Sequence, residues 1–137
     1  MATKTKSQPE VRKSEAEWEH TLTPEQHHVL RRQETEAAGS SPLLDEHREG
    51  MFCCAGCGAP LFSSDTKFES GSGWPSFWAP LDGSVDAEED ASHFMTRTEV
   101  HCHQCGGHLG HVFEDGPQPT GLRYCTNGLA LKFDPAK

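Results

Sequence analysis

The fold of this chain is decided by Cys54-Ala55-Gly56-Cys57-Gly58 and, much further along, Cys102-His103-Gln104-Cys105-Gly106. In each motif two residues separate the thiols, so a tight turn can direct both toward one tetrahedral metal ion. The glycine after each second cysteine can adopt a positive φ and turn backbone N–H groups toward the sulfurs. We therefore expect one structural zinc ion, closed to water and substrate, that joins two distant turns. Its expected ligands are Cys54, Cys57, Cys102 and Cys105.

A pair of redox dithiols is the alternative interpretation of these motifs. Reactive dithiols of that kind lie at the start of a helix, and neither motif precedes a plausible helix. Paired thiols in a reducing compartment point to metal or redox chemistry before structural disulfides. The expected compartment is the cytoplasm, because residues 1–6 are followed by polar residues where a signal peptide needs an apolar stretch. No apolar segment approaches membrane-spanning length.

The composition limits the chain to one domain and excludes several partners. With 137 residues, of which 34% are apolar, the chain can enclose a single modest core. The net charge of −9 repels phosphate backbones and anionic lipids, so neither nucleic acid nor a membrane is an expected partner. We interpret the acidic run at residues 82–90 as a solvated loop rather than a docking patch. The protein is expected to be a monomer.

The chain divides into a tail, a helical part and a β core. Residues 1–17 are polar and mixed in charge, so we expect a disordered tail followed by a single domain at 18–137. The helical part covers 18–47. From 48 to 135, short apolar runs alternate with Gly, Pro, Asp and Ser, which predicts a mainly β unit built from antiparallel strands around the zinc.

Two local patterns refine this division. Thr23-Pro24-Glu25-Gln26 combines a capping threonine, a proline at the first helical position and a glutamine that completes a capping box. The helix is expected to run to about Glu36. Residues 128–133 predict a half-buried strand. Its inward-facing residues are Leu129, Leu131 and Phe133.

A strand just before that segment is expected to present a thiol. Side chains alternate between the two faces of a strand, so Arg123, Cys125 and Asn127 share one face, while Leu122 and Tyr124 pack into the core. Cys125 belongs to neither cysteine pair. A nearby cation lowers the pKa of a thiol and favours the nucleophilic thiolate. A cysteine in a strand is also often a buried apolar residue, and that interpretation remains open.

Histidines and aromatic residues supply the other candidates. His108 and His111 are close enough in sequence to address one site, and imidazole titrates near neutral pH and can donate a proton. Zinc binding and a solvated position are the competing interpretations. Trp74 lies between a glycine and a proline, which predicts an exposed turn that lines a pocket. Phe77 and Trp78 are expected in the core.

Together, these motifs resemble the methionine-R-sulfoxide reductases, the B type of that activity. The resemblance covers residues 22–133, and its matching stretches are 22–26, 54–62, 67–77 and 99–127. It implies two antiparallel β-sheets with short N-terminal helices and a structural zinc, with Cys125 as the nucleophile. The residues that it assigns to the substrate site are Trp74, His108, His111, Phe113, Arg123 and Asn127.

The resemblance also implies a reaction. Methionine-R-sulfoxide, in proteins or peptides in preference to the free amino acid, would be reduced to methionine by attack of Cys125 on the sulfur. Arg123 would favour the thiolate, and His111, assisted by His108, would orient or protonate the oxygen, directly or through water. Asn127 would position the polar network, and Trp74 would hold the S-methyl group. Cys125 would be left as a sulfenic acid, to be recycled by thioredoxin or another thiol.

The sequence departs from the common family pattern in two places. Ser72 stands where many members carry a resolving cysteine, and Gly128 stands where serine is frequent. Cys53 is the only cysteine left unassigned, so it becomes the candidate resolving residue. The alternatives are direct resolution by an external thiol and a purely structural role for Cys53 in a strand.

Two other classes of function remain open from the sequence. A zinc-ribbon interaction module would need the metal site but no reactive thiol. A cysteine hydrolase would use Cys125 with His111 on an acyl substrate. The module would leave methionine sulfoxide untouched, and the hydrolase would accumulate an acyl-enzyme.

Overall fold

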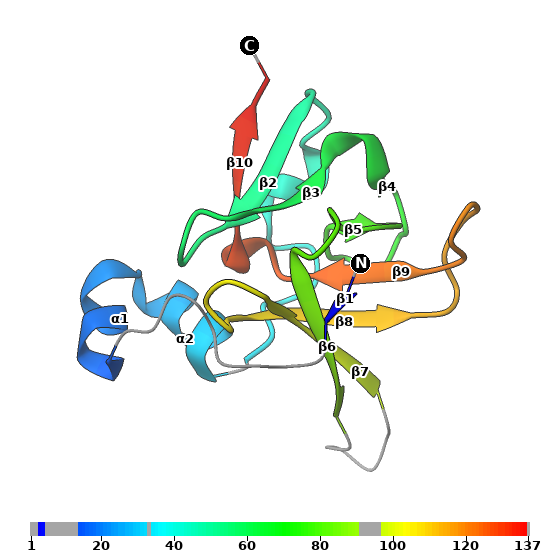
Figure 1. Ribbon diagram of the computed structural model, residues 1–137. Coiled ribbons are helices and arrows are strands. Elements are labelled where there is room, and N and C mark those ends of the chain that lie inside the picture. The colour runs from blue at the N-terminus through cyan, green and yellow to red at the C-terminus, as the bar shows by residue number, and fades with distance from the viewer. Residues whose placement is uncertain (1–2, 5–13, 33, 91–96, 137) are drawn as a thin grey trace.

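Two β-sheets and several short helices make up the part of the chain that the computed structural model describes, residues 3–4, 14–32, 34–90 and 97–136 (Figure 1). The larger sheet has the strand order β1 (Thr3–Lys4), β6 (Val85–Asp90), β7 (Arg97–Cys102), β8 (His108–Phe113), β9 (Arg123–Thr126), β5 (Ser76–Phe77) and β4 (Lys67–Phe68). The smaller sheet has the order β10 (Leu131–Pro135), β2 (Gly50–Cys54) and β3 (Pro60–Ser63). The helices are α1 (Glu15–Thr21), α2 (Pro24–Arg32) and the 3-10 helices η1 (Pro42–Asp45), η2 (Ser64–Thr66) and η4 (Gly128–Ala130).

The strand pairing confirms the expected fold class. Every strand pair in the described residues is antiparallel except β1 with β6, which is parallel. Figure 1 shows α1 and α2 together on one side, next to the turn between β7 and β8. The fold is therefore mainly β, with two sheets and short N-terminal helices, as the sequence predicted.

Capping boxes set the starts of both α-helices. In α2, the Thr23 hydroxyl accepts from the Gln26 N–H at 3.1 Å and the Gln26 side chain accepts from the Thr23 N–H at 3.0 Å, as expected. Ser14 and Glu17 form a second box, which the sequence analysis overlooked. Helix α1 therefore begins inside the stretch assigned to the tail, of which residues 5–13 lie outside the described residues. No helix in the described ranges is both long and apolar enough to cross a membrane.

The acidic run is part of a strand, so its interpretation as a loop is wrong. Residues Val85–Asp90 form β6 and pair with β7. Asp86 is 5% exposed, and its carboxylate lies 3.0 Å from the His103 ring. A carboxylate that has a partner can be buried in a strand, whereas composition alone suggests a solvated segment.

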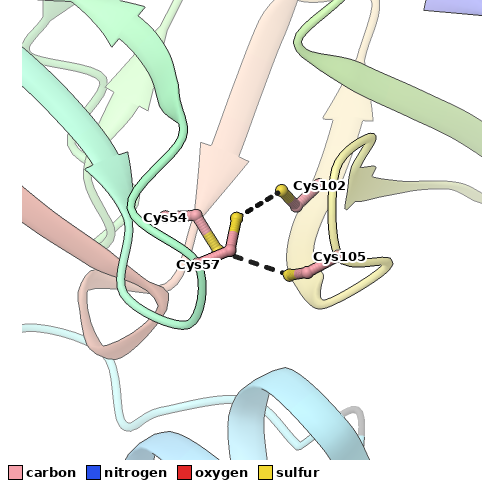
Figure 2. A group of neighbouring side chains, drawn as sticks. All are labelled: Cys54, Cys57, Cys102 and Cys105. Atoms are coloured by element: carbon pink, nitrogen blue, oxygen red, sulfur yellow. Dashed lines mark hydrogen bonds between the residues drawn. The ribbon is translucent and has the colours of Figure 1, made fainter. Parts of the chain in front are cut away.

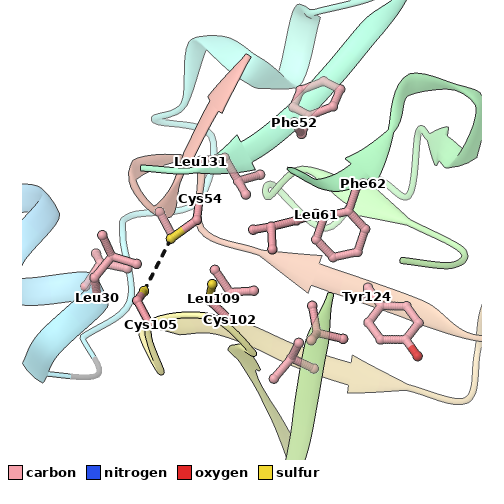
Figure 3. Close-up of a cluster of buried hydrophobic side chains, with 14 of the residues drawn as sticks. Leu30, Phe52, Cys54, Leu61, Phe62, Cys102, Cys105, Leu109, Tyr124 and Leu131 are labelled. Atoms are coloured by element: carbon pink, nitrogen blue, oxygen red, sulfur yellow. Dashed lines mark hydrogen bonds between the residues drawn. The ribbon is translucent and has the colours of Figure 1, made fainter. Parts of the chain in front are cut away.

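Aromatic side chains fill the space between the two sheets. Phe62 stacks on Phe77 with ring centroids 4.3 Å apart, and Phe52 meets Phe77 edge-on at 5.0 Å. Tyr124 packs at 6.0 Å from Phe62. Burying each such side chain stabilises the fold by about 1.5–3 kcal/mol. Figure 3 shows this layer together with Leu30 from α2, so one core joins the sheets to the helices. Phe77 is in the core as predicted, whereas Trp78 is only half-buried.

The 3-10 helix η4 carries the chain from the larger sheet to the smaller one. The sequence predicted a strand from residue 128, but Gly128–Ala130 forms a turn, and the strand begins at Leu131. The turn is closed by the Ala130 N–H, which donates to the Asn127 carbonyl at 3.0 Å. The alternation of apolar and polar residues could not predict this turn. The passage to the smaller sheet depends on which strand β10 pairs with, and that is set by tertiary contacts. Leu131 still faces the core.

Candidate active site

The four paired cysteines converge at one point (Figure 2). The sulfurs of Cys54 and Cys105 are 3.6 Å apart, as are those of Cys57 and Cys102. All four sulfurs lie within 4.8 Å of one another. Zinc–sulfur bonds of about 2.3 Å in a tetrahedron place neighbouring sulfurs about 3.8 Å apart. The cluster therefore has the size and donor set of a four-thiolate zinc site, and we call it the cysteine cluster.

The turns that hold the cysteine cluster use glycine as the sequence suggested, with one difference. Gly58 and Gly106 have positive φ values of 82° and 78°. Their N–H groups donate to the carbonyl oxygens of Cys54 and Cys102 at 2.8 Å rather than to sulfur. The sulfur of Cys54 instead accepts from the Gly56 N–H at 3.3 Å. The positive φ of Gly58 and Gly106 therefore closes the two turns, and in the first turn the N–H group that faces a sulfur belongs to Gly56.

The N-terminal helices cover the cysteine cluster. The Arg31 guanidinium of α2 donates to the Cys105 carbonyl at 3.1 Å. Gly56 and Gly107 lie so close to Leu30 that an added β-carbon would be 3.6 Å and 2.8 Å from its methyl groups. A metal bound here would therefore hold together two turns and the helix packed against them.

A separate pocket of about 230 Å³ contains the lone thiol. Cys125 lies on β9 between Tyr124 and Thr126, which are both more deeply buried than the thiol residue. The cross-strand neighbours of Cys125 are His111 on β8 and Ser76 on β5. The residues that line the pocket are Thr35, Ser72, Trp74, Arg97, Gly110, His111, Phe113, Arg123, Cys125, Thr126 and Asn127. The alternation along β9 therefore does what the sequence predicted and turns the thiol away from the core.

The electrostatic surroundings of Cys125 differ from the expectation. Burial raises the pKa of the thiol, and the Ser72 hydroxyl and the Arg123 guanidinium lower it only in part. The Ser72 oxygen lies 3.9 Å from the sulfur. The Glu36 carboxylate adds a small effect that raises the thiol pKa. Arg123 therefore acts in the direction that the sequence suggested, but burial outweighs it in the free protein.

Arg123 is held in place by two contacts at the edge of the pocket. Its guanidinium makes a two-point ion pair with Asp115, at 2.9 Å and 3.3 Å. It also lies over the ring of Phe113, 4.5 Å from the centroid. The pairing raises the pKa of Arg123 further, so the charge is permanent. Phe113 is thereby fixed as one wall of the pocket.

The two histidines have different positions. His111 lines the pocket, whereas His108 is 2% exposed and is absent from the pocket wall. The His108 Nδ1 lies 2.5 Å from a Glu99 oxygen, and the rings of His108 and His111 are 5.6 Å apart. Burial raises the pKa of Glu99, but hydrogen bonds from His101 and His108 outweigh it and bring the value to about 2. An ionised Glu99 therefore holds His108 behind His111.

Trp74 and Asn127 meet the chain that follows α2. The Trp74 indole N–H donates to the Glu36 carbonyl at 3.0 Å. The Asn127 side-chain oxygen accepts from the Glu36 N–H at 2.9 Å, and its amide nitrogen donates to the Leu109 carbonyl at 3.1 Å. The helix was expected to include Glu36, but it ends at Arg32, and Glu36 makes these contacts instead.

Comparison with known proteins identifies the family of a chain that combines the cysteine cluster with the Cys125 pocket. Residues 22–135 match the SelR domain. The chain belongs to the SelR family. A peptide methionine sulfoxide reductase MsrB of Leptospira interrogans is 59% identical over 125 residues, which cover 90% of this chain and 95% of that protein. The MsrB proteins of Agrobacterium fabrum and Methanosarcina barkeri are 52% and 56% identical over 128 residues, covering 93% of this chain and 95% and 90% of those proteins. The chain is therefore a B-type peptide methionine sulfoxide reductase, an oxidoreductase.

The structure of this reductase does not bring Cys53 to the pocket. Cys53 pairs with Lys132 across β2 and β10, so the two side chains lie on the same face, and Lys132 is exposed. The adjacent Phe52 points the other way, into the aromatic layer. Cys125 belongs to the larger sheet, and its side chain also faces away from the aromatic layer. The two thiols therefore lie on opposite outer faces of sheets that pack about 10 Å apart, whereas a disulfide needs β-carbons within about 4.5 Å.

The departure at Gly128 has a steric cause. A β-carbon at Gly128 would lie 1.9 Å from the Ser41 hydroxyl and 2.5 Å from the Ser41 β-carbon. Ser41 is itself fixed, because its hydroxyl accepts from the Leu43 N–H at 3.1 Å and begins η1. The reductase therefore requires glycine here for as long as residue 41 carries a side chain.

Sequence reasoning missed several pocket residues of the reductase. Thr35, Arg97 and Gly110 line the pocket and were not singled out. Gly110 had a recognisable signal, because it lies between the two candidate histidines. A β-carbon there would come within 1.9 Å of the Cys125 carbonyl, so β8 and β9 could not pair. The sequence around Thr35 and Arg97 contains no pattern that would predict a position in the pocket.

Proposed function

We propose that the reductase acts on methionine-R-sulfoxide, in proteins or peptides in preference to the free amino acid, with Cys125 as the nucleophile. The observation that carries this proposal is the position of Cys125 in a pocket that also contains Trp74 and His111. An apolar ring, a proton donor and a thiol are the three groups that the reaction requires. A sulfoxide sulfur becomes electrophilic only when its oxygen is protonated.

Substrate binding is assigned to the aromatic residues of the pocket. Trp74 and Phe113 would hold the S-methyl group, which leaves the oxygen on the polar side. The Arg123 guanidinium lies over the Phe113 ring and restricts its position, which supports this assignment. Because the methyl group and the oxygen would be held by different walls, only one arrangement around the sulfur places the lone pair and the thiolate correctly. This is the physical basis for selecting the R epimer.

The chemical step uses one thiol and one proton. The Cys125 thiolate attacks the sulfoxide sulfur while His111 donates a proton to the oxygen. This attack forms a bond between the two sulfurs. The hydroxyl group then transfers from the substrate sulfur to Sγ, so the sulfur–oxygen bond of the substrate and the sulfur–sulfur bond both break and a new Sγ–oxygen bond forms. Methionine leaves with the electron pair of the sulfur–sulfur bond, and Cys125 is left as a sulfenic acid. Arg123 stabilises the thiolate, and Asn127 positions the polar groups around it. The cross-strand pairing of His111 with Cys125 supports these roles.

His108 acts through His111 rather than on substrate. It is buried, and Glu99 accepts a hydrogen bond from its Nδ1, so its ring has a fixed orientation. A fixed ring against His111 restricts how His111 can rotate. We assign His108 as a positioning residue, which is a narrower role than the sequence suggested.

Resolution of the sulfenic acid is assigned to an external thiol. Ser72 offers no thiol, and Cys53 lies across the core from Cys125, which favours direct resolution by an external thiol over resolution by Cys53. The incoming thiolate would attack the sulfur of Cys125 and release water. A second thiol, or the partner thiol of a dithiol such as thioredoxin, would then restore Cys125 and leave as a disulfide.

The cysteine cluster is proposed to bind one structural zinc ion. Four thiolates fill its coordination sphere, so it would supply no chemistry to the sulfoxide. Its role would be to fix the turns after β2 and β7 and the helix above them. A monomer in the cytoplasm remains the expected state of the protein.

Single-turnover reduction tests the proposed function. Reduced enzyme is mixed with a methionine sulfoxide peptide of either epimer, without a reductant, and methionine is quantified. The R epimer should give one methionine per enzyme together with a sulfenic acid on Cys125, and the S epimer should give none. Equal reduction of both epimers would reject the proposed selection, and reduction without oxidation of Cys125 would reject the nucleophile.

A further inference from the structure

Glu36 connects three parts of the pocket. It lies in the segment 34–41 that runs from α2 to η1, which we call the strap, and it is 7% exposed. Its N–H donates to the Asn127 side chain at 2.9 Å, and its carbonyl accepts from the Trp74 indole at 3.0 Å. Its carboxylate accepts from the Leu129 N–H at 2.8 Å. One buried residue therefore holds a proposed substrate-binding ring, a proposed polar residue and the turn that follows it.

The carboxylate of Glu36 takes over a task that usually belongs to Asn127. Asn127 is the N-cap residue of η4, a position where an asparagine side chain commonly accepts from an N–H of the first turn. Here its side chain makes no capping bond. The Leu129 N–H is satisfied by Glu36 instead. Asn127 is thereby free to use its amide on the Glu36 N–H and the Leu109 carbonyl.

The strap also fixes the loop that carries Trp74. Besides the indole bond to Glu36, the Gly39 N–H donates to the Gly73 carbonyl at 2.7 Å. Gly73 has a φ of 95°, and a β-carbon there would lie 2.8 Å from the Ala38 β-carbon. The two backbones therefore lie in direct contact just after Glu36, and a displacement of the strap would displace Trp74.

We propose that Glu36 is a positioning residue of the sulfoxide site, because its carboxylate caps η4 in place of Asn127 and so keeps Asn127 and Trp74 in their substrate-binding arrangement. This inference rests on the proposed roles of those two residues. Glu36 contacts no reacting atom in this account. Its effect passes through the strap and through the hydrogen bonds that it leaves available to Asn127.

Loss of the carboxylate has a defined consequence. The Leu129 N–H would lose its partner, and the side chain of Asn127, which occupies the N-cap position, is an acceptor of the preferred type for it. Once Asn127 caps the turn, its amide no longer holds the Glu36 N–H or the Leu109 carbonyl. The strap is then attached at fewer points, and the Trp74 indole loses its fixed acceptor. Gln in place of Glu36 keeps the oxygen that caps Leu129.

The test compares Glu36→Ala, Glu36→Gln and a matched strap variant, Ser40→Ala. The Ser40 hydroxyl donates to the Ala37 carbonyl at 2.6 Å, within the strap, and none of the hydrogen bonds found among the described residues joins it to Trp74 or Asn127. For each purified protein, kcat and KM are measured with a methionine-R-sulfoxide peptide. Indole N–H exchange of Trp74 and the side-chain amide resonances of Asn127 are followed by NMR. Metal content and circular dichroism report whether the fold is retained.

Glu36→Ala should lower kcat/KM about tenfold, which corresponds to one hydrogen bond of ordinary strength, with faster exchange of the Trp74 indole and a shifted Asn127 amide. Glu36→Gln should restore most of the loss, and Ser40→Ala should behave like the unchanged protein. The proposal is overturned if Glu36→Ala stays within twofold in kcat/KM, if neither NMR signal changes, or if Gln is as damaging as Ala.

Trp74→Ala and Asn127→Ala separate this inference from the proposed function. Full activity in both variants would remove the assigned roles of Trp74 and Asn127, and with them the catalytic meaning of Glu36. The NMR signals would still report whether Glu36 holds the two side chains. Loss of activity in both, together with an unaffected Glu36→Ala protein, would leave the proposed function intact and reject the role of Glu36 alone.

Discussion

The hydroxyl oxygen of Ser72 lies 3.9 Å from the sulfur of Cys125 and is connected through Ser70 to the buried hydroxyl of Ser76, at 2.8 Å and 2.7 Å. Three serine hydroxyls therefore form a continuous chain beside the proposed nucleophile. At position 72, where the resemblance to the family leads us to expect a thiol, the serine supplies only a hydrogen-bonding hydroxyl.

Replacing Ser72 by Ala should raise the pKa of Cys125. Burial already raises this pKa, and Ser72 and Arg123 counteract it. Without the hydroxyl, the thiolate loses one stabilising contact, so a higher pH is needed to form it. The rate of alkylation by iodoacetamide, followed against pH in a Cys53→Ser background, should have its midpoint at higher pH. A Ser84→Ala control should not move it, and a lowered midpoint in Ser72→Ala would reject the contact.

Replacing Cys125 by Ser should abolish single-turnover reduction and leave the metal in place. Serine is nearly isosteric, but its hydroxyl is a far weaker nucleophile, and Cys125 lies outside the cysteine cluster. Methionine formation and zinc content are measured on the same sample. Retained reduction would remove the nucleophile assignment, and lost zinc would mean that the substitution disturbs the fold.

Turnover should leave no Cys53–Cys125 disulfide. After one round with sulfoxide alone, mass mapping should find the sulfenic acid on Cys125 with Cys53 unmodified, and Cys53→Ser should turn over normally. Ser72→Cys provides the positive control, because it places a thiol beside Cys125 and should give an internal disulfide. A trapped Cys53–Cys125 disulfide would contradict the positions of the two sheets.

Loss of one residue of the cysteine cluster should unfold the β core. Metal binding to such sites contributes about 10–16 kcal/mol, which is comparable to the whole stability of a small domain. Cys102→Ser should therefore show lost zinc and lost tertiary structure together, by metal analysis and near-ultraviolet circular dichroism. The same outcome is expected on treatment with a strong chelator. A folded, zinc-free Cys102→Ser protein would contradict the structural role.

Replacing Gly128 by Ser should destabilise the protein by about 1–3 kcal/mol, because the added side chain collides with Ser41. Urea unfolding measures the loss. Ser41→Gly in the same chain should recover part of it, since it removes both colliding atoms, although it also removes the cap of η1. Ser41→Ala keeps the β-carbon and should recover less. Additive effects of the two substitutions would reject the collision.

The parts of the site that could be predicted are those that depend on local spacing. The cysteine pairs converge because a two-residue spacing fits a turn, and Cys125 and Arg123 share a face because strands alternate. The alternation of side chains along a strand could also have predicted the orientation of Cys53. Its neighbour Cys54 faces inward, so Cys53 faces outward. That the pocket lies on the other outer face depends on how the sheets pack, which no local pattern contains.

The role proposed for Glu36 could not be predicted from the sequence. Its helical surroundings suggested one more turn of α2, and its partners Trp74, Asn127 and Leu129 are distant in the chain. Two of its three hydrogen bonds use its backbone N–H and carbonyl groups, which almost every residue possesses. The identity of residue 36 therefore gives no indication of these two bonds. Pairing registers across β7, β8 and β9, which align Glu99, His111 and Cys125, are likewise set by tertiary contacts.

If Cys125 is oxidised during turnover as proposed, its separation from Cys53 gives the catalytic cycle a bimolecular step. None of the other cysteines can close on the oxidised residue without breaking the core or the cysteine cluster. On the proposed mechanism the oxidised enzyme would depend on collision with an external thiol, so we expect turnover at saturating sulfoxide to rise with the concentration of that thiol. The supply of reducing thiol around the protein would then set the speed at which it restores methionine.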